Sequence, residues 1–105
     1  MYISDLIDLY AKSINNIDLV KGQIFNVGGG PTNQLSLLEL ISIIEKLSRE
    51  KISYSKSDWR PGDQKIYVSD IRRVEEYLRW SSKTDVNTGI EALYDWVLEN
   101  QKVFA

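Results

Sequence analysis

The predicted fold rests on the stretch QIFNVGGGPTN, residues 23–33. Its first five residues form a short apolar run of strand-forming types, which predicts a buried strand over 23–27. The three glycines and Pro31 cannot continue a strand or a helix, so a loop follows. Ser36-Leu37-Leu38-Glu39 is a capping box, which marks the start of a helix that runs to about Arg49. Residues 51–55 then alternate like a second strand, and the sequence predicts a βαβ unit with parallel strands.

The sequence on either side of this unit predicts one further strand and three further helices. Apolar residues recur at helical spacing from Asp5 to about Asn16, with Ser4 as a possible cap. Residues 65–68 read as a third strand, a helix begins after Ser69 or Asp70, and Trp80 ends it. Asp85 is suited to cap a last helix. Its predicted inward stripe is Ile90, Leu93, Tyr94, Val97 and Leu98. The predicted fold class is α/β, a small α+β-like domain over residues 1–105, with a short, largely parallel sheet of two or three strands and about four helices.

The composition excludes several classes of function. The chain has 105 residues, of which 13 are Lys or Arg and 15 are Asp or Glu, so its net charge of −2 favours neither nucleic acid nor an anionic membrane as a partner. It contains no Cys and no His, which removes thiol nucleophiles, Ser-His pairs and Cys/His zinc sites. No basic segment precedes a long apolar run, and no apolar run approaches membrane length. We expect a cytoplasmic protein without a metal site.

The main candidate site is the loop Trp59-Arg60-Pro61-Gly62-Asp63-Gln64. The planar guanidinium of Arg60 suits paired phosphate oxygens, and Asp63 can accept hydrogen bonds from sugar hydroxyls. Pro61 and Gly62 favour a stiff, sharp turn between them. One alternative remains open: Arg60 and Asp63 simply pair across a surface turn while Trp59 fills the core, instead of supporting Arg60 or flanking a ligand.

The glycine loop and the paired carboxylates are weaker candidates. A dinucleotide fingerprint starting at Gly28 needs a third glycine where Asn33 stands, and Pro31 lacks an amide donor, so a tight turn is the better interpretation. Glu75 and Glu76 lie on a helix flank at exposed spacing. No Tyr is followed by a Lys four residues later. We therefore predict no catalytic residue and no cofactor-binding residue in this chain.

The order of motifs along the chain resembles the C-terminal part of the extended short-chain dehydrogenase/reductases, the NAD-dependent nucleotide-sugar epimerases and dehydratases. The resemblance runs from Tyr2 to about Val103, and the loop 59–64 is most similar to the group around the CDP-paratose (CDP-tyvelose) 2-epimerases. The matching motifs are Tyr2-Ile3-Ser4-Asp5-Leu6, Phe25-Asn26-Val27-Gly28-Gly29, Ser36-Leu37-Leu38-Glu39-Leu40, Arg60-Pro61-Gly62-Asp63, Ser69-Asp70-Ile71 and Trp80.

The resemblance implies a substrate-binding role. In such enzymes the Arg of the matching loop grips the substrate diphosphate and the Asp holds the ribose, which points to Arg60 and Asp63, with Trp59 as a weaker third contact. The Gly-rich NAD-binding Rossmann domain and the Tyr-x-x-x-Lys pair of the family precede the matching region, and both are absent here. The resemblance thus implies a domain that binds a nucleoside-diphosphate sugar, partners a missing N-terminal domain, and is inactive alone.

A second hypothesis is an adaptor or oligomerisation domain of the same fold that no longer binds nucleotide. Without the NAD-binding half, the face that would pack against it is left exposed and apolar, which favours self-association.

Overall fold

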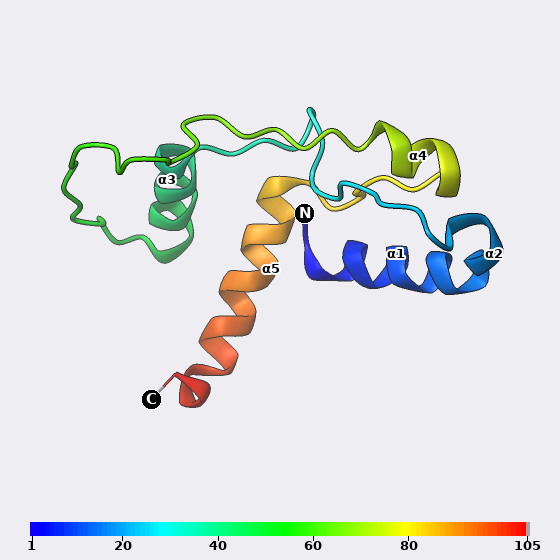
Figure 1. The fold of residues 1–105 in the computed structure, drawn as a ribbon. Coiled ribbons are helices and arrows are strands. Elements are labelled where there is room, and N and C mark those ends of the chain that lie inside the picture. Colours follow the sequence, from blue (N-terminus) through cyan, green and yellow to red (C-terminus); the bar gives the residue numbers. More distant parts are fainter. Residues whose placement is uncertain (105) are drawn as a thin grey trace.

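The computed structural model describes residues 1–104, and within them every regular element is a helix (Figure 1). The elements, in chain order, are α1 (Ile3–Asn15), α2 (Ile17–Val20), α3 (Leu37–Ser48), α4 (Arg72–Leu78), α5 (Val86–Glu99) and the short 3₁₀ turn η1 (Gln101–Val103). No strand occurs in residues 1–104, so the predicted α/β fold with a βαβ unit and a parallel sheet is wrong.

The three segments predicted as strands have no partners. In residues 23–27, 51–55 and 65–68, no backbone hydrogen bond joins any segment to another. Figure 1 shows that 23–27 runs beside α2 and α4, whereas 51–55 lies at the opposite end of the molecule, beyond α3. A strand is stable only when a neighbour pairs with its N–H and C=O groups, so strand-forming residue types alone were not enough.

The helix starts that depend on a local cap were predicted correctly. At α3 the capping box is complete: the Glu39 amide donates to Ser36 Oγ (3.2 Å) and the Ser36 amide to Glu39 Oε2 (2.8 Å). At α5 the Thr88 amide donates to Asp85 Oδ1 (3.0 Å). The predicted cap of α1 at Ser4 is wrong, because that helix begins two residues earlier than predicted, at Ile3, and its cap residue Tyr2 makes no side-chain cap hydrogen bond. The short helix α2 was not predicted.

The start of α4 also differs from the prediction. Neither Ser69 nor Asp70 occupies the cap position, which is Ile71. Asp70 still acts nearby, because its Oδ1 accepts a hydrogen bond from the Arg72 amide (3.1 Å).

The hydrophobic core lies where α1, α2 and α4 meet, and it is small. Trp80 and Val74 are its most completely buried side chains. The buried apolar residues are Leu9, Val20, Ile71, Val74, Leu78 and Trp80. The indole Nε1 of Trp80 donates to the Asp5 carbonyl oxygen (3.1 Å), which satisfies the one polar atom of that ring.

Helices α3 and α5 pack against each other away from this core, and neither buries any residue fully. The predicted inward stripe of α5 is largely exposed, at Leu93 and Leu98 among others. Trp96 is exposed too, with its ring edge-on to Phe104 at a centroid distance of 6.1 Å. The prediction that this stripe faces the core is wrong for most of its residues, because α3, which packs against α5, leaves Leu93, Val97 and Leu98 exposed.

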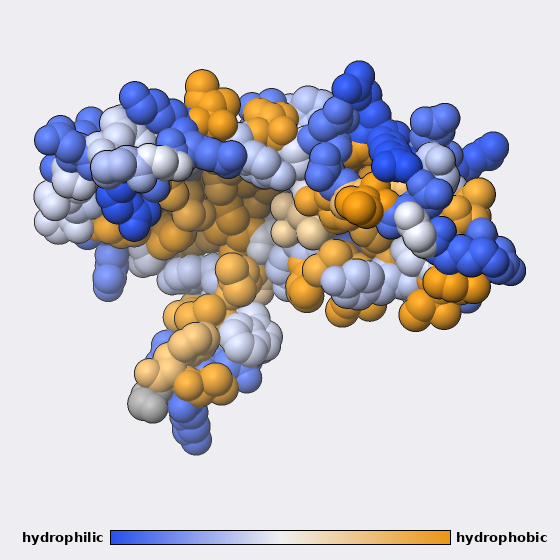
Figure 2. Space-filling view, in the orientation of Figure 1, coloured by the Kyte–Doolittle hydropathy of each residue, from blue (hydrophilic) through white to orange (hydrophobic). Residues whose placement is uncertain are grey.

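The molecule is consequently extended and exposes much apolar surface. Its radius of gyration is 17.0 Å, against about 13 Å for a compact domain of this length. Its accessible surface is 8739 Å², against roughly 6,000 Å² for a monomeric protein of this mass. Figure 2 shows apolar residues spread over the visible face, including a hollow between the two ends of the molecule. Among the described residues no helix has both the length and the apolarity that crossing a membrane requires.

Candidate functional site

The loop 59–64 forms the turn that its sequence predicts. The Asp63 amide donates to the Arg60 carbonyl oxygen (3.1 Å), which closes a four-residue turn. Gly62, at its third position, has φ = +85°, a conformation that L-residues rarely adopt and that a type II turn requires there. Pro61 fixes the second position, so proline and glycine together make the turn rigid.

The turn brings the two predicted binding residues together. Arg60 Nε donates to Asp63 Oδ2 at 3.2 Å, and the two side chains are 86% and 34% exposed. An exposed ion pair of this kind contributes less than about 1 kcal/mol, because water and salt screen it. The guanidinium can therefore leave Asp63 for a more highly charged anion at little cost.

Trp59 lies outside the core. Its side chain is 62% exposed, so the part of the alternative in which Trp59 fills the core is wrong, whereas the pairing of Arg60 with Asp63 across the turn is present. Lys65 follows the turn, and its ammonium nitrogen lies 5.6 Å from the centre of the Trp59 ring. At that distance the cation is attracted to the face of the ring.

The glycine loop packs closely against residues 69–71. The Gly30 amide, at φ = +69°, donates to Ser69 Oγ (3.0 Å). A Cβ atom at Gly28 would collide with the same Ser69 side chain, and one at Gly30 would meet Ile71. Residues 69–71 thus occupy the Gly30 amide and the space beside Gly28 and Gly30.

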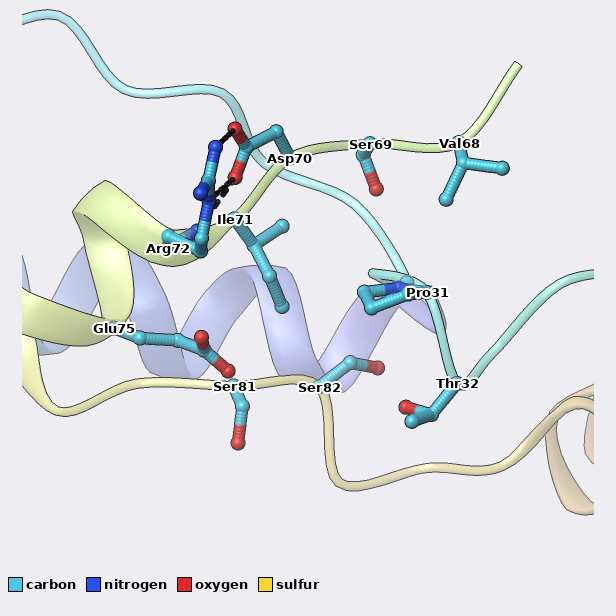
Figure 3. A pocket seen from close by; sticks show the side chains of 11 residues that line it. Pro31, Thr32, Val68, Ser69, Asp70, Ile71, Arg72, Glu75, Ser81 and Ser82 are labelled. Atoms are coloured by element: carbon cyan, nitrogen blue, oxygen red, sulfur yellow. Dashed lines mark hydrogen bonds and ion pairs between the residues drawn. The ribbon is translucent and has the colours of Figure 1, made fainter.

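A cavity of about 460 Å³ lies between the glycine loop, the start of α4 and residues 81–82 (Figure 3). Asp70 and Arg72 form a bidentate pair at its edge, with Arg72 Nε on Oδ1 (2.9 Å) and Nη2 on Oδ2 (2.6 Å). These hydrogen bonds lower the pKa of Asp70 to about 2. None of Trp59, Arg60 and Asp63 lines this cavity.

A buried carboxylate joins α1 to the segment before α5. Asp5 is 5% exposed, and its two oxygens accept hydrogen bonds from Ser82 Oγ, the Lys83 and Thr84 amides, and Thr84 Oγ1, at 2.8 to 3.3 Å. Burial raises the pKa of Asp5, but the hydrogen bonds from Ser82, Thr84 and Lys83 outweigh it and hold that pKa below its ordinary value. This carboxylate therefore has a structural role, because it holds α1 against residues 82–84; we refer to these contacts as the joint at Asp5.

Comparison with known proteins shows that the chain is similar to part of several nucleotide-sugar epimerases. CDP-paratose 2-epimerase of Salmonella typhi is 32% identical over 96 residues, which cover 91% of this chain and 28% of that protein. UDP-glucose 4-epimerase 2 of Arabidopsis thaliana is 28% identical over 102 residues, 95% of this chain and 29% of its own. UDP-glucuronate 4-epimerase of Thermodesulfobacterium geofontis is 26% identical over 93 residues, 89% and 28% respectively. The chain is a relative of the nucleotide-sugar epimerases. No family model matches it.

The relationship to the nucleotide-sugar epimerases confirms the resemblance seen in the sequence. A match over 91% of the chain includes the loop 59–64, which lies in its interior. The chain spans a little over a quarter of the length of these epimerases.

Sequence reasoning missed two features of this epimerase relative: the contact of Lys65 with Trp59, and the joint at Asp5. Trp59 and Lys65 are six positions apart across a turn, so the turn itself was the available signal. The only signal for Asp5 was its place within the motif Tyr2-Ile3-Ser4-Asp5-Leu6. The local sequence does not reveal its hydrogen-bond partners, because they lie almost eighty residues away.

Proposed function

We propose that this chain is the substrate-binding part of an NAD-dependent nucleotide-sugar epimerase or dehydratase, and that Arg60 and Asp63 grip the nucleoside diphosphate of the substrate. The observation that carries the proposal is the exposed Arg60–Asp63 pair on a rigid turn, in a chain related to nucleotide-sugar epimerases. Arg60 binds the diphosphate oxygens in pairs. Asp63, released from Arg60, accepts hydrogen bonds from the ribose hydroxyls.

The chain's own contribution is binding and orientation. A rigid turn holds the diphosphate in one place, so the attached sugar is presented to the reacting groups in a fixed direction, which lowers the barrier by positioning. The residues of the glycine loop do not fit NAD, because Ser69 already takes the Gly30 amide and Pro31 has none to offer. We expect NAD, which accepts and returns the hydride in this family, to be bound by the part of the longer relatives that the chain does not match.

The test is a titration of isotope-labelled protein with CDP, UDP, dTDP and GDP, followed by backbone amide NMR shifts. We expect chemical-shift changes that saturate with nucleotide concentration and are centred on residues 60–64. The nucleotide that binds most tightly identifies the substrate class. Arg60→Ala should weaken binding by at least about ten-fold, because a charge-assisted bidentate contact is lost. Arg60→Lys should recover only part of it, since an ammonium cannot bind bidentately.

The control variant is Lys56→Ala, which removes an exposed cation just before the loop. Lys56 makes no hydrogen bond or ion pair in the described part of the chain, so its loss should leave affinity unchanged. If none of the four nucleotides changes the amide chemical shifts, or if the changes persist in Arg60→Ala, the proposal is wrong.

The second candidate is the adaptor or oligomerisation domain. It is favoured by the outward stripe of α1, where Ile3, Ile7, Tyr10 and Ile14 are exposed opposite the face that carries Leu9. A helix that is apolar on two faces needs cover on both. Sedimentation over a hundred-fold range of protein concentration distinguishes the two candidates. Self-association that is unaffected by Arg60→Ala, in a chain that binds none of the nucleotides, would favour this candidate over the first.

A further inference from the structure

The segment 59–65 carries two cations in different states. Arg60 is paired with Asp63, so its charge is partly compensated. Lys65 forms no ion pair within residues 1–104, and its ammonium group lies over the exposed Trp59 ring. The uncompensated cation of the loop is therefore Lys65, a residue to which the sequence assigned no role.

The charge of the expected ligand calls for more than one cation. A nucleoside diphosphate carries at least two negative charges near neutral pH, and one guanidinium that also contacts a carboxylate compensates them only in part. A cation over an aromatic face is weakly held compared with a cation in a charge-assisted hydrogen bond to phosphate. Lys65 therefore has a reason to leave the ring when phosphate oxygens are near.

The geometry of the turn keeps Lys65 close to the binding residues. The hydrogen bond from the Asp63 amide to the Arg60 carbonyl reverses the chain direction, so the residues after the turn come back toward those before it. The contact between Lys65 and Trp59 is the result, and Trp59 is the immediate neighbour of Arg60. The long, flexible stem of Lys65 allows its ammonium group to move without disturbing this backbone.

We propose that Lys65 is a second diphosphate-binding residue of the loop, held on Trp59 in the free chain and transferred to the phosphate oxygens when the nucleotide binds. The inference rests on the proposed function and deepens it. No covalent step is involved: one cation–ring contact is exchanged for hydrogen bonds between the ammonium group and phosphate. Trp59 acts as the resting place of the lysine rather than as a direct ligand.

The experiment uses the whole chain and three probes: CDP, UDP and inorganic pyrophosphate. Lys65→Met keeps the length and apolar stem of the side chain but removes its charge, and Lys65→Arg restores a cation. We expect Lys65→Met to weaken the binding of each probe about five- to ten-fold, and Lys65→Arg to recover most of the lost affinity. Lys56→Met, the matched control, should bind like the unmodified chain, which excludes a simple effect of net charge.

A second readout follows the ring itself. The chain has three Trp residues, so the NMR spectrum contains three indole N–H signals, and Trp59→Phe assigns the relevant one. Binding should shift this signal in the unmodified chain and leave it nearly still in Lys65→Met, because no cation is then present to leave the ring.

The outcomes separate the two proposals. If Lys65→Met binds as tightly as the unmodified chain while Arg60→Ala does not bind, the role of Lys65 is wrong and the proposed function stands. If Lys65→Met and Lys56→Met lose affinity equally, the effect is one of net charge and the role of Lys65 is again wrong. If no probe binds the unmodified chain, both proposals fall together.

Discussion

At the scale of single residues, Asp5 shows how one buried charge can fix the arrangement of distant segments. Its carboxylate is acceptor-only, and the four groups that surround it are all donors. Each oxygen takes one backbone amide and one hydroxyl. The hydroxyls of Ser82 and Thr84 can rotate, whereas the amides of Lys83 and Thr84 cannot, so the arrangement demands two acceptor atoms.

Asp5→Asn is expected to destabilise the fold by about 2–3 kcal/mol. In either orientation of the new amide its NH₂ group faces one of the two backbone amides, and that buried donor loses its partner. Urea denaturation measures the change. Asp18→Asn is the control: it removes a carboxylate of an exposed pair with Lys21 and should cost less than about 0.5 kcal/mol. Equal effects of the two variants would contradict the role of Asp5 as a joint.

The lowered pKa of Asp5 predicts a loss of stability in acid. A carboxylate whose pKa is lower in the folded state than in the unfolded state stabilises the fold above the unfolded value of about 3.9, and this contribution disappears as the pH falls through the folded pKa. Between about pH 5 and pH 2 the unmodified chain should therefore lose stability more steeply than Asp5→Asn. The difference between the two urea midpoints, followed against pH, checks this. A constant difference would mean that the pKa of Asp5 is the same in both states.

At the scale of elements, the start of α3 depends on two reciprocal hydrogen bonds. Ser36→Ala removes the side-chain acceptor of the capping box and should cost about 1 kcal/mol in unfolding free energy. Ser42→Ala, in the exposed middle of the same helix, should have the opposite sign, because alanine has the higher helix propensity and no cap is lost. Thermal unfolding followed by circular dichroism tests both. Two changes of equal sign would show that the box makes no net contribution.

The elements also show which structural information is local. Ser36 and Asp85 cap helices through residues three positions away, so a short window of sequence was sufficient to predict them. A strand at 23–27 would have needed a partner strand, which no window of this chain specifies. In the site, the turn at Arg60–Asp63 was predictable because proline and glycine determine it. The contact of Lys65 with Trp59 depends on how the chain leaves that turn, and the residue types alone do not state this.

At the scale of the whole molecule, the exposed apolar surface dominates. The accessible area exceeds that of a compact monomer by roughly 2,700 Å², which is more than one partner usually contributes to a standard protein interface, about 800 Å². Within residues 1–104 the core consists of six buried apolar residues. The stability of the isolated chain should therefore depend on few side chains.

The outward stripe of α1 provides a test of this surface. Ile7 is 60% exposed and Ile14 71%, whereas Leu9 is 4% exposed. Ile7→Glu and Ile14→Glu should each change the unfolding free energy by less than about 0.5 kcal/mol, while Leu9→Ala should cost about 2–4 kcal/mol because it opens a cavity. Urea denaturation at two protein concentrations measures all three. A cost at Ile7 similar to that at Leu9 would show that the stripe is covered in solution.

The joint at Asp5 has a consequence for the order of events during synthesis. Its partner Thr84 is 79 positions further along the chain, and a ribosome adding 5–20 residues per second needs roughly 4–16 s to reach it. A helix of 13 residues such as α1 is marginal in water until it packs. We therefore expect α1 to stay unanchored on the nascent chain, with its apolar side chains accessible to chaperones, and to dock only after residues 80–84 have been released.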